Sequence, residues 1–500
     1  MSAPFWELRR FSLAHRRDGE WLLENVDLTI PAGGFYLLVG ASGGGKSSLM
    51  RLSAGLLETR EPELHTQGEM FCLGTAVQRG MPKELRHRIA AVLQEEGLFD
   101  ELTPRQNIEL ALRTVGRSLK LAPALLAQVG LDPVPEQTTQ LSGGQRKRLA
   151  VARALVGEPE VLFCDEPTAG LDPAAARKMA ELLCESQKRT PLATTVVITH
   201  DIAAFKGLVD GVIELDPTQR TLRLVALGAV ELLSKVPRVP LRPAAKGDGD
   251  ELLHGVKRQL LQLAAIGETL VESVLRLPPV EIGQVLRTTL QCSLSPLAFV
   301  AAGSAVIGGL ATFFALRNNP MQGAFESALL GGTGKVLIAV LVPLLSGFFF
   351  TARVAAGAAA RLGTMKRNQQ VFALVSMGIR PSDYLLTPLV WGMVLAMPIV
   401  TFVGVVAASF AAMLASEVVA GTSSAGWASA FFSHLDAADL RVVVVKAALS
   451  GYLVAVTCYH LGIGPKRSGA EVGDAVNRAI VIGMSLVLLV HALLTFVVYA

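Results

Sequence analysis

A glycine-rich segment near the start of the chain has the residue types and spacing of a phosphate-binding loop. The stretch FYLLVGASGGGKSSLMRL reads as a buried strand, then Gly40, four residues, Gly45, Lys46 and Ser47, and the start of a helix. Glycines let the backbone curl so that successive N–H groups converge on phosphate oxygens, and the following helix adds the positive end of its dipole. The spacing predicts that Lys46 contacts the terminal phosphates of a nucleotide and that Ser47 holds Mg²⁺. The predicted nucleotide-binding residues of this loop are Gly40, Ser42, Gly43, Gly44, Gly45, Lys46, Ser47 and Ser48.

Two carboxylates follow a second apolar strand. In VLFCDEPTAGLD, four apolar residues precede Asp165 and Glu166. At a phosphate site one carboxylate can bind Mg²⁺ and its neighbour can polarise the attacking water, so we assign the metal to Asp165 and the role of base to Glu166. Acids at a strand end also cap helices, so the pair alone does not decide between the two interpretations.

A histidine ends a third apolar strand. The stretch VVITHD places His200 where it could hydrogen-bond a γ-phosphate, and we count it with Glu166 among the catalytic candidates. A single histidine after a strand is more often structural, so its position alone leaves both interpretations open.

A second helix start in the same region also has the composition of an anion site. In LSGGQRKRLAVARAL, a serine and two glycines precede a helix that carries Arg146, Lys147 and Arg148. A helix N-terminus attracts anions, but one nucleotide does not need two such sites from a single subunit. We therefore predict that the second site serves the nucleotide of a partner subunit. Its residues are Ser142, Gly143, Gly144 and Gln145.

These motifs resemble those of the ABC transporter ATPases, and the resemblance covers about residues 5–233. In that family's terms the Walker A loop is 40–48 and the signature is 141–145, while Asp165 is the Walker B aspartate and Glu166 the catalytic base. The resemblance implies ATPase domains that pair head to tail, with ATP held between the Walker A loop of one subunit and the signature of the other.

The same resemblance adds two residues to the site and assigns a role to a third. Gln94, in AVLQEEGLFDELTPRQN, matches the Q-loop glutamine, which implies a role in catalysis and at the metal. Asp172 lies in the D-loop AGLD, and His200 matches the switch histidine. Because every motif is present, the resemblance implies a homodimer in which both sites hydrolyse ATP with Mg²⁺.

The distribution of charge divides the chain into a water-soluble front and a membrane-embedded back. Of its 500 residues 51% are hydrophobic and 18% charged, which is too apolar for one ordinary soluble domain. Of the 46 basic and 42 acidic residues, 19 in total lie between 294 and 500. The net charge of +4 and the lack of a basic tail do not support a nucleic-acid partner, and we predict none.

Two further features bear on the compartment. The five cysteines have neither CxxC nor CxxH spacing, so we predict buried thiols rather than a zinc site or a disulfide framework. The first ten residues, MSAPFWELRR, contain acid and base and no apolar run. We therefore predict no cleavable signal peptide and expect the front half in the cytoplasm.

A break in pattern separates the two halves. We predict an ABC ATPase domain over 1–233 and a linker over 234–256, where SKVPRVPLRPAAKGDGDELLHG is rich in proline and glycine. The permease domain takes 257–500 and opens with VKRQLLQLAAIGETLVESVLRLPP. Its leucines have helical spacing, but its interleaved charges are too many for a span. We predict a helix at the membrane interface, with a soluble helix packed on the ATPase as the alternative.

Five later segments are long and apolar enough to cross a bilayer, which takes about 20 residues each. The third contains Pro388 and Pro398 and is expected to be kinked or partly interfacial. Basic residues gather between the second and third segments and between the fourth and fifth, so these loops are predicted to face the cytoplasm and Ala500 to lie outside. The segments run over 294–316, 336–360, 384–416, 442–463 and 479–499.

The largest of these loops is RVAAGAAARLGTMKRNQQVFALVSMGIRPSDYLLTP, residues 353–388. Its positive charge fits a simple topological signal. The amphipathic stretch QQVFALVSMGI within it also has the pattern of a helix built to dock. We favour a coupling helix that contacts the ATPase over a purely topological role.

The permease half resembles the permeases of Mce-associated, Mla-type lipid transporters over roughly 260–500. The matching runs are LGTM at 362–365, the MGIRP and YLLTP that follow, and GAEVG at 469–473. In the family the permease and the ATPase are usually separate chains, whereas here the ATPase is fused in front. Acidic positions of the family are lost: Arg361 replaces a usual Glu, Phe372 a usual Asp, and VLVP at 340–343 a usual ELGP.

Together the two resemblances imply a fold and a function. The expected fold is an α/β P-loop ABC ATPase domain followed by an all-α transmembrane domain of about five spans with an N-terminal interfacial helix. The expected function is an ATP-driven homodimeric half-transporter in the bacterial inner membrane, which moves phospholipid or another hydrophobic molecule with a separate Mce-domain partner. The near absence of charge in the spans permits such a cargo. The alternatives are a small-molecule or peptide exporter, and a non-transporting machine that pulls on an envelope protein.

Overall fold

The computed structural model divides into two compact units. One contains Met1–Gly247 together with Asn368–Arg380, and the other contains Asp248–Arg367 and Pro381–Ala500. The described residues are 4–14, 20–41, 43–56, 64–77, 85, 88–189, 193–225, 266–267, 270–271, 282–318, 325–466 and 468–499. Ser42, the linker predicted at 234–256 and nearly all of the interfacial helix predicted after it lie outside these residues.

A six-stranded sheet forms the centre of the first unit, in the order β10-β9-β3-β8-β7-β6. All neighbours are parallel except β10 with β9. The runs FYLLVG, VLFCD and TTVVI are almost continuously apolar, as expected for strands that are covered on both faces. Parallel strands end at one edge, so the predicted site residues that follow β3, β7 and β8 are brought together there. The strands are β3 (Phe35–Gly40), β6 (Ile89–Val92), β7 (Val161–Asp165), β8 (Thr194–Ile198), β9 (Gly211–Asp216) and β10 (Thr221–Val225).

A second, antiparallel sheet packs in the same unit, in the order β2-β1-β4-β5. Phe5 and Trp6 are buried at the start of β1, and the ring of Trp6 lies 6.5 Å from that of Phe163 in β7, edge to face. One hydrophobic core therefore joins the two sheets. The strands are β1 (Trp6–Ala14), β2 (Trp21–Ile30), β4 (His65–Cys72) and β5 (Thr75–Ala76).

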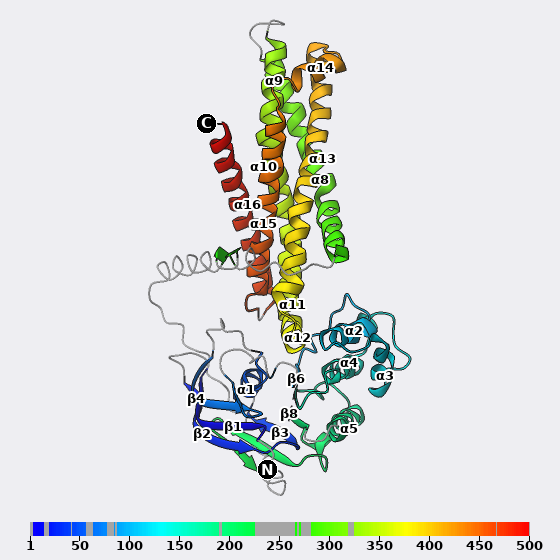
Figure 1. Cartoon of the computed structure of the whole chain (residues 1–500), viewed down its shortest axis with the longest axis vertical. Helices are drawn as coiled ribbons and strands as arrows, with labels where there is room; N and C mark the ends of the chain where they lie inside the picture. The colour runs from blue at the N-terminus through cyan, green and yellow to red at the C-terminus, as the bar shows by residue number, and fades with distance from the viewer. Residues whose placement is uncertain are drawn as a thin grey trace. The chain divides into compact units, whose positions relative to one another are not determined.

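Helices flank the six-stranded sheet (Figure 1). Their starts follow local sequence signals: Thr103 and Gln106 cap α2 reciprocally, with a proline at its first turn. The segment Asn368–Arg380 belongs to this unit although it lies within the predicted permease range, and its helix α12 packs beside β6. The helices are α1 (Lys46–Ser53), α2 (Pro104–Thr114), α3 (Ala122–Gln128), α4 (Gly143–Leu155), α5 (Pro173–Arg189) and α12 (Gln370–Ser376).

Over its described residues the second unit is helical and has five helices long and apolar enough to cross a membrane, which confirms the predicted number and order of spans. They are Ile282–Arg317, Glu326–Arg367, Ser382–Ala420, Ala437–Ile463 and Gly469–Tyr499. One expectation is wrong: Arg353 and Arg361 do not lie in a loop, because the second of these helices continues without a break to Arg367. The region between the second and third spans is therefore short and contains α12.

The second and third of these helices contain wider π-helical turns. In the second, α9 (Glu326–Val336) leads through η6 (Leu337–Leu341), α10 (Val342–Phe350) and η7 (Thr351–Ala355) to α11 (Ala356–Arg367). Pro343 comes directly after a wide turn, which accommodates its ring and its missing N–H. The third joins η8 (Ser382–Leu386) to α13 (Thr387–Ala420), which runs on through Pro398.

Small residues bring the helices of the second unit close together. A Cβ on Gly308 would collide with the main chain of Ala408, and one on Gly451 with that of Met393. The helices α8 (Ile282–Arg317), α13 and α15 (Ala437–Ile463) pack side by side through such contacts (Figure 1). Close approach through glycine is how helices associate where lipid removes the hydrophobic driving force. The unit is completed by α14 (Ser424–Phe431) and α16 (Gly469–Tyr499).

One lysine lies deep inside this helical unit. Lys446, in α15, is completely buried, and its Nζ donates to the carbonyl of Ala339 at 3.3 Å and to the hydroxyl of Thr495 at 2.8 Å. Two turns earlier, Asp439 accepts a hydrogen bond from the hydroxyl of Tyr499 at 2.5 Å. The ammonium is therefore satisfied by oxygen acceptors rather than by a direct carboxylate partner.

Candidate nucleotide and catalytic site

The loop between β3 and α1 has the shape that its glycines predict. Gly40 ends β3, and Gly45 caps α1 with a φ of 96°, in the left-handed region that favours glycine. A Cβ on Gly40 would collide with the carbonyl of Leu215. Lys46 is 6% exposed, and its Nζ donates to the carbonyls of Gly40 at 2.8 Å and Ala41 at 2.9 Å. The ammonium thus lies over the loop, where it can turn to a phosphate.

Asp165 and Ser47 form a site that fits a magnesium ion. Asp165, the last residue of β7, is 2% exposed, and the neighbouring Ser47 hydroxyl favours the ionised form of its carboxylate. Its Oδ1 atom is buried and has no hydrogen-bond partner among the described residues. Burial raises the pKa of Asp165, while Ser47, Arg51, Lys46 and His200 oppose the rise. A hydroxyl and a carboxylate with a spare oxygen are ligands that Mg²⁺ prefers.

Glu166 and His200 come together at the same edge of the sheet. Their Oε1 and Nε2 atoms are 3.3 Å apart, and the amide of Glu166 donates to the carbonyl of Ile198 at 2.9 Å. Burial raises the pKa of Glu166, and the neighbouring Asp165 adds to the rise, whereas His200 and Lys46 oppose it. A carboxylate with a raised pKa is a stronger base, which suits a group that accepts a proton from water.

The signature segment is a capped and open helix start. The hydroxyl of Ser142 accepts from the amide of Gln145 at 3.3 Å, and the side-chain oxygen of Gln145 accepts from the amide of Ser142 at 2.9 Å. Ser142 and Gly143 are exposed, and a Cβ on Gly143 would meet nothing within 4 Å. Gly144 faces Leu171 of the D-loop turn. The first amides of α4 are therefore accessible to a ligand from outside the chain.

Gln94 is the site residue that the structure leaves apart. Its side chain is exposed, and within the described parts of the chain no hydrogen bond joins it to Ser47 or Asp165. Its predicted roles at the metal and in catalysis stay predictions.

The burial of two basic residues of α4 was not predicted from the sequence, which named Lys147 only among the charges of an anion-binding helix and did not single out Arg153. Lys147 donates to the carbonyls of Glu166, at 3.1 Å, and Ala169. Arg153 donates to the carbonyls of Gly97 at 2.7 Å and Glu96 at 2.8 Å, and burial lowers the pKa of Arg153 to about 10. A signal existed, because both residues fall at helical spacing from the buried residues of α4 and hence on its apolar face.

The helix α12 packs on the segment that follows Gln94. The Gln370 amide donates to the carbonyl of Leu98 at 2.6 Å, and a Cβ on Gly97 would lie 2.9 Å from that of Ala373. Phe372 is 7% exposed within the core of the ATPase unit. The guanidinium of Arg51, in α1, lies 5.5 Å from the centre of its ring. An apolar and cation–π contact therefore holds Phe372 in the ATPase unit.

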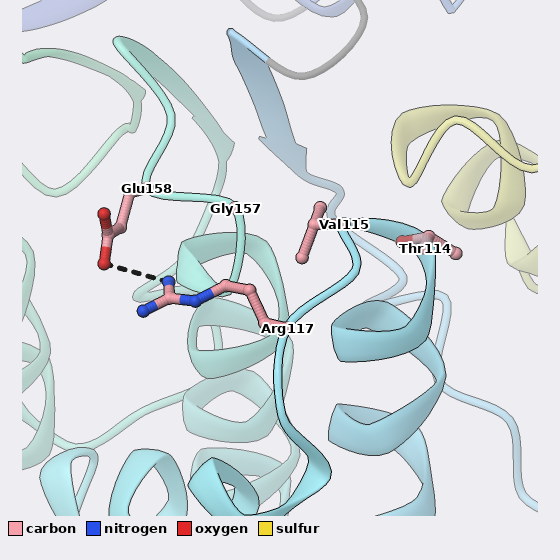
Figure 2. Close-up of a pocket in the computed structure, with 5 residues that line it drawn as sticks. All are labelled: Thr114, Val115, Arg117, Gly157 and Glu158. Carbon is pink, nitrogen blue, oxygen red and sulfur yellow. Dashed lines mark ion pairs between the residues drawn. The ribbon is translucent and has the colours of Figure 1, made fainter.

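A separate cavity opens elsewhere on this unit. It has a volume of about 530 Å³ and is lined by Thr114, Val115, Arg117, Gly157 and Glu158. Figure 2 shows the ion pair on its wall, in which an Arg117 nitrogen lies 2.9 Å from a Glu158 oxygen. These lining residues are distinct from the candidate site residues, so the cavity is not the nucleotide site.

Comparisons with known proteins match both halves of the chain. A family model described as "ABC transporter" matches residues 23–169, and one described as "Permease MlaE" matches 285–497. The chain is 32% identical over 351 residues to the methionine import ATP-binding protein MetN of Caulobacter vibrioides, which covers 67% of this chain and 97% of that protein. It is 34% identical to MetN 2 of Oenococcus oeni over 42% of this chain, and there it spans 62% of the relative's length.

Solved structures match the N-terminal part. The dimeric ATP-binding cassette MJ0796 bound to ADP and phosphate has a TM-score of 0.38 and 26% identity, and covers 44% of this chain and 98% of its own. The cbiO1 protein from Clostridium perfringens, part of the cbiONQ complex, has a TM-score of 0.40 and 24% identity, with 53% and 99% covered.

Proposed function

The chain belongs to the ABC transporter family, with an ABC ATPase domain fused to an MlaE permease, and on that premise we propose that it is one half of a homodimeric transporter that uses ATP to move phospholipid or another hydrophobic molecule. It is a multi-pass membrane protein with a cytoplasmic ATPase domain. We place it in the bacterial inner membrane, with a periplasmic Mce-domain protein as its partner.

The observation that carries the ATPase part is the meeting of Lys46, Asp165, Glu166 and His200 at one edge of the sheet. Lys46 binds the terminal phosphates, and Ser47 and Asp165 hold the ion. The bound Mg²⁺ neutralises phosphate charge. Glu166 accepts the proton of the attacking water, and His200 orients the base and the γ-phosphate. Exchange of Glu166 for Gln, with ATP binding and hydrolysis measured separately, tests this assignment.

The homodimer follows from the open signature of one chain. The exposed residues Ser142 and Gly143, at the start of α4, offer an anion site at the N-terminus of this helix. A two-fold axis would set the signature of each chain opposite the Walker A loop of the other, so both sites would be complete. Cross-linking of the full chain in membranes should trap a two-chain species, whereas a monomer with full ATP turnover would contradict the pairing.

The helix α12 is proposed to couple the ATPase to the permease. Gln370 holds the main chain of Leu98, and Arg153 of the signature helix holds the adjacent Gly97. The segment after Gln94 is thus held from both sides within one compact unit. A movement of this segment on ATP binding would reach α12 through these bonds, and α12 is continuous in sequence with two predicted spans.

The cargo and the partner rest on the MlaE match. The candidate spans hold few charges, and the fully buried Lys446 donates its hydrogen bonds within the helical unit, which suits an apolar or amphipathic cargo. Purification of the full chain from native membranes, followed by mass spectrometry of co-purifying proteins and lipids, tests both. An Mce-domain protein with enriched phospholipid would support the proposal. Reproducible absence of both would favour a small-molecule or peptide exporter, or a machine that pulls on an envelope protein.

Methionine is a second candidate cargo, because relatives of the chain are named as methionine import ATP-binding proteins. The permease half matches a different description, so we rank this candidate lower. Uptake of labelled methionine by cells that express the chain, compared with its Glu166→Gln variant, distinguishes the two.

A further inference from the structure

Lys147 is a charged side chain buried beneath the signature helix. It lies two residues after the signature, is 8% exposed, and shares the buried face of α4 with Ala150 and Val151. Its ammonium donates to the main-chain carbonyl of Glu166 at 3.1 Å and to that of Ala169. Burying an ammonium is costly unless its donors are satisfied, and here two acceptors are provided by a single turn.

The carbonyls of Glu166 and Ala169 lie at the two ends of the turn that contains the proposed base. Glu166 has a φ of 50°, in the left-handed region that non-glycine residues seldom occupy. Its carbonyl also accepts from the amide of Ala169 at 3.2 Å. A conformation of this kind persists only where the surroundings impose it. Lys147 supplies one bond at each end of the turn, so it is among the groups that impose it.

Carboxylates on two segments face the same ammonium. Burial lowers the pKa of Lys147, and the carboxylates of Glu96 and Glu166 act in the opposite direction. Glu96 lies in the segment that Arg153 and α12 hold. Lys147 therefore lies at the junction of the signature helix, the turn of the base and the segment after Gln94.

We propose that Lys147 is a positioning residue for Glu166. Its hydrogen bond holds the main chain of the catalytic base against the signature helix. The contact between Lys147 and the main chain of Glu166 lies within one chain. Its consequence rests on the proposed homodimer: the signature of a chain engages the nucleotide of its partner, while Glu166 acts on the nucleotide of its own chain. Turnover at one site then depends on the position of the helix that serves the other.

The test compares Lys147→Met and Lys147→Gln with the wild-type full chain reconstituted in lipid nanodiscs. Methionine keeps most of the buried volume but cannot donate, whereas glutamine keeps two neutral N–H donors on a shorter chain. The control is Lys178→Met in α5, which removes the same charge from an exposed residue outside the site. Displacement of a reacting group by about 1 Å costs about 100-fold in rate, so we expect Lys147→Met to lower kcat about 10- to 100-fold. Lys147→Gln should fall between Met and wild type, and Lys178→Met should match wild type.

Separate measurement of kcat and KM distinguishes a positioning role of Lys147 from a purely structural one. We expect KM for ATP and the ATP dissociation constant of Lys147→Met to stay within about threefold of wild type. Wild-type kcat in Lys147→Met would overturn the proposal, as would losses of kcat and ATP binding in parallel. If Lys147→Met does not fold, Lys147→Gln carries the test: at least a threefold loss of kcat with unchanged KM is expected, and wild-type kcat overturns it. Absence of hydrolysis by the wild-type chain would instead remove the proposed function.

Discussion

The two units of this chain use polar residues in opposite ways. In the ATPase unit the functional side chains follow the ends of strands or begin helices, as Lys46, Glu166 and Ser142 do, and they converge on one edge or open to solvent. In the helical unit Lys446 lies in the middle of a long apolar helix and is bonded to neighbouring helices. The comparison shows that functional residues at the ends of strands and helices can be recognised from local sequence motifs. Polar residues inside a helix bundle depend on contacts between segments that are distant in sequence.

The largest expected effect lies at the site defined by motifs. Glu166→Gln should lower kcat by about 100- to 10,000-fold, because the amide cannot accept the proton of the attacking water. ATP binding should persist, since Lys46 and Asp165 are unchanged. Steady-state ATP hydrolysis and equilibrium binding of a fluorescent ATP analogue measure the two. Wild-type turnover in this variant would show that the motif misidentifies the base.

The pH dependence of the same reaction sharpens this assignment. Burial raises the pKa of Glu166, and only the deprotonated carboxylate can accept a proton. The rate kcat should therefore fall as the pH drops through this raised pKa, at a higher pH than for an ordinary glutamate. The pH profile of single-turnover hydrolysis tests it, and a flat profile down to the ordinary range of glutamate would contradict it.

A smaller effect is expected from Lys46→Ala, which removes charge-assisted hydrogen bonds to phosphate. Such a bond contributes about 1.5 to 3 kcal/mol, so the ATP dissociation constant should rise about 10- to 100-fold. Isothermal titration with ATP and Mg²⁺ measures the change. Retention of wild-type affinity would indicate that Lys46 keeps its bonds to Gly40 and Ala41 when the nucleotide is bound.

In the helical unit the matching prediction concerns packing. Gly308→Leu should separate α8 from α13 and destabilise that unit by about 1 to 3 kcal/mol, as overpacking does. Gly332→Leu is the matched control, because a Cβ there meets nothing within 4 Å. Thermal unfolding in detergent compares the two, while nucleotide binding should be preserved in both. Equal stability of the two variants would contradict the close contact.

The smallest expected effect concerns the coupling of ATP hydrolysis to transport. Gln370→Ala removes one hydrogen bond to the carbonyl of Leu98 and should weaken the docking of α12 by about 1 kcal/mol. Transport per ATP hydrolysed should fall, while the hydrolysis rate itself should change less. Ser376→Ala serves as the control, because it removes a half-buried hydroxyl that donates to the carbonyl of Ala373 within the same helix. An unchanged transport-to-hydrolysis ratio for Gln370→Ala would deny α12 a coupling role.

The same contrast explains what the sequence could predict. The Walker loop, the carboxylate pair and the five spans follow from local pattern, because strand ends and apolar length are visible in short windows. The buried contacts of Lys147 and Arg153 were not predicted, since their partners are main-chain carbonyl groups, which no side-chain motif records. Phe372 was seen as a departure from related permeases, but its partner Arg51 is more than 300 residues away in sequence. The loop predicted around Arg353 proved helical because the span continues well beyond its apolar segment.

The way α12 is held has a consequence for its response to salt. Among the described residues its contacts include the buried ring of Phe372 near Arg51, a neutral amide bond from Gln370, and the apolar side chains of Val371 and Leu374. Dissolved ions screen exposed charge pairs over about 8 Å at physiological ionic strength, but they act little on buried apolar surface and neutral hydrogen bonds. An acid in place of Phe372 would have made docking an ion pair that weakens as salt rises. The helix found here should stay docked across a wide range of ionic strength, and urea or guanidinium should release it instead.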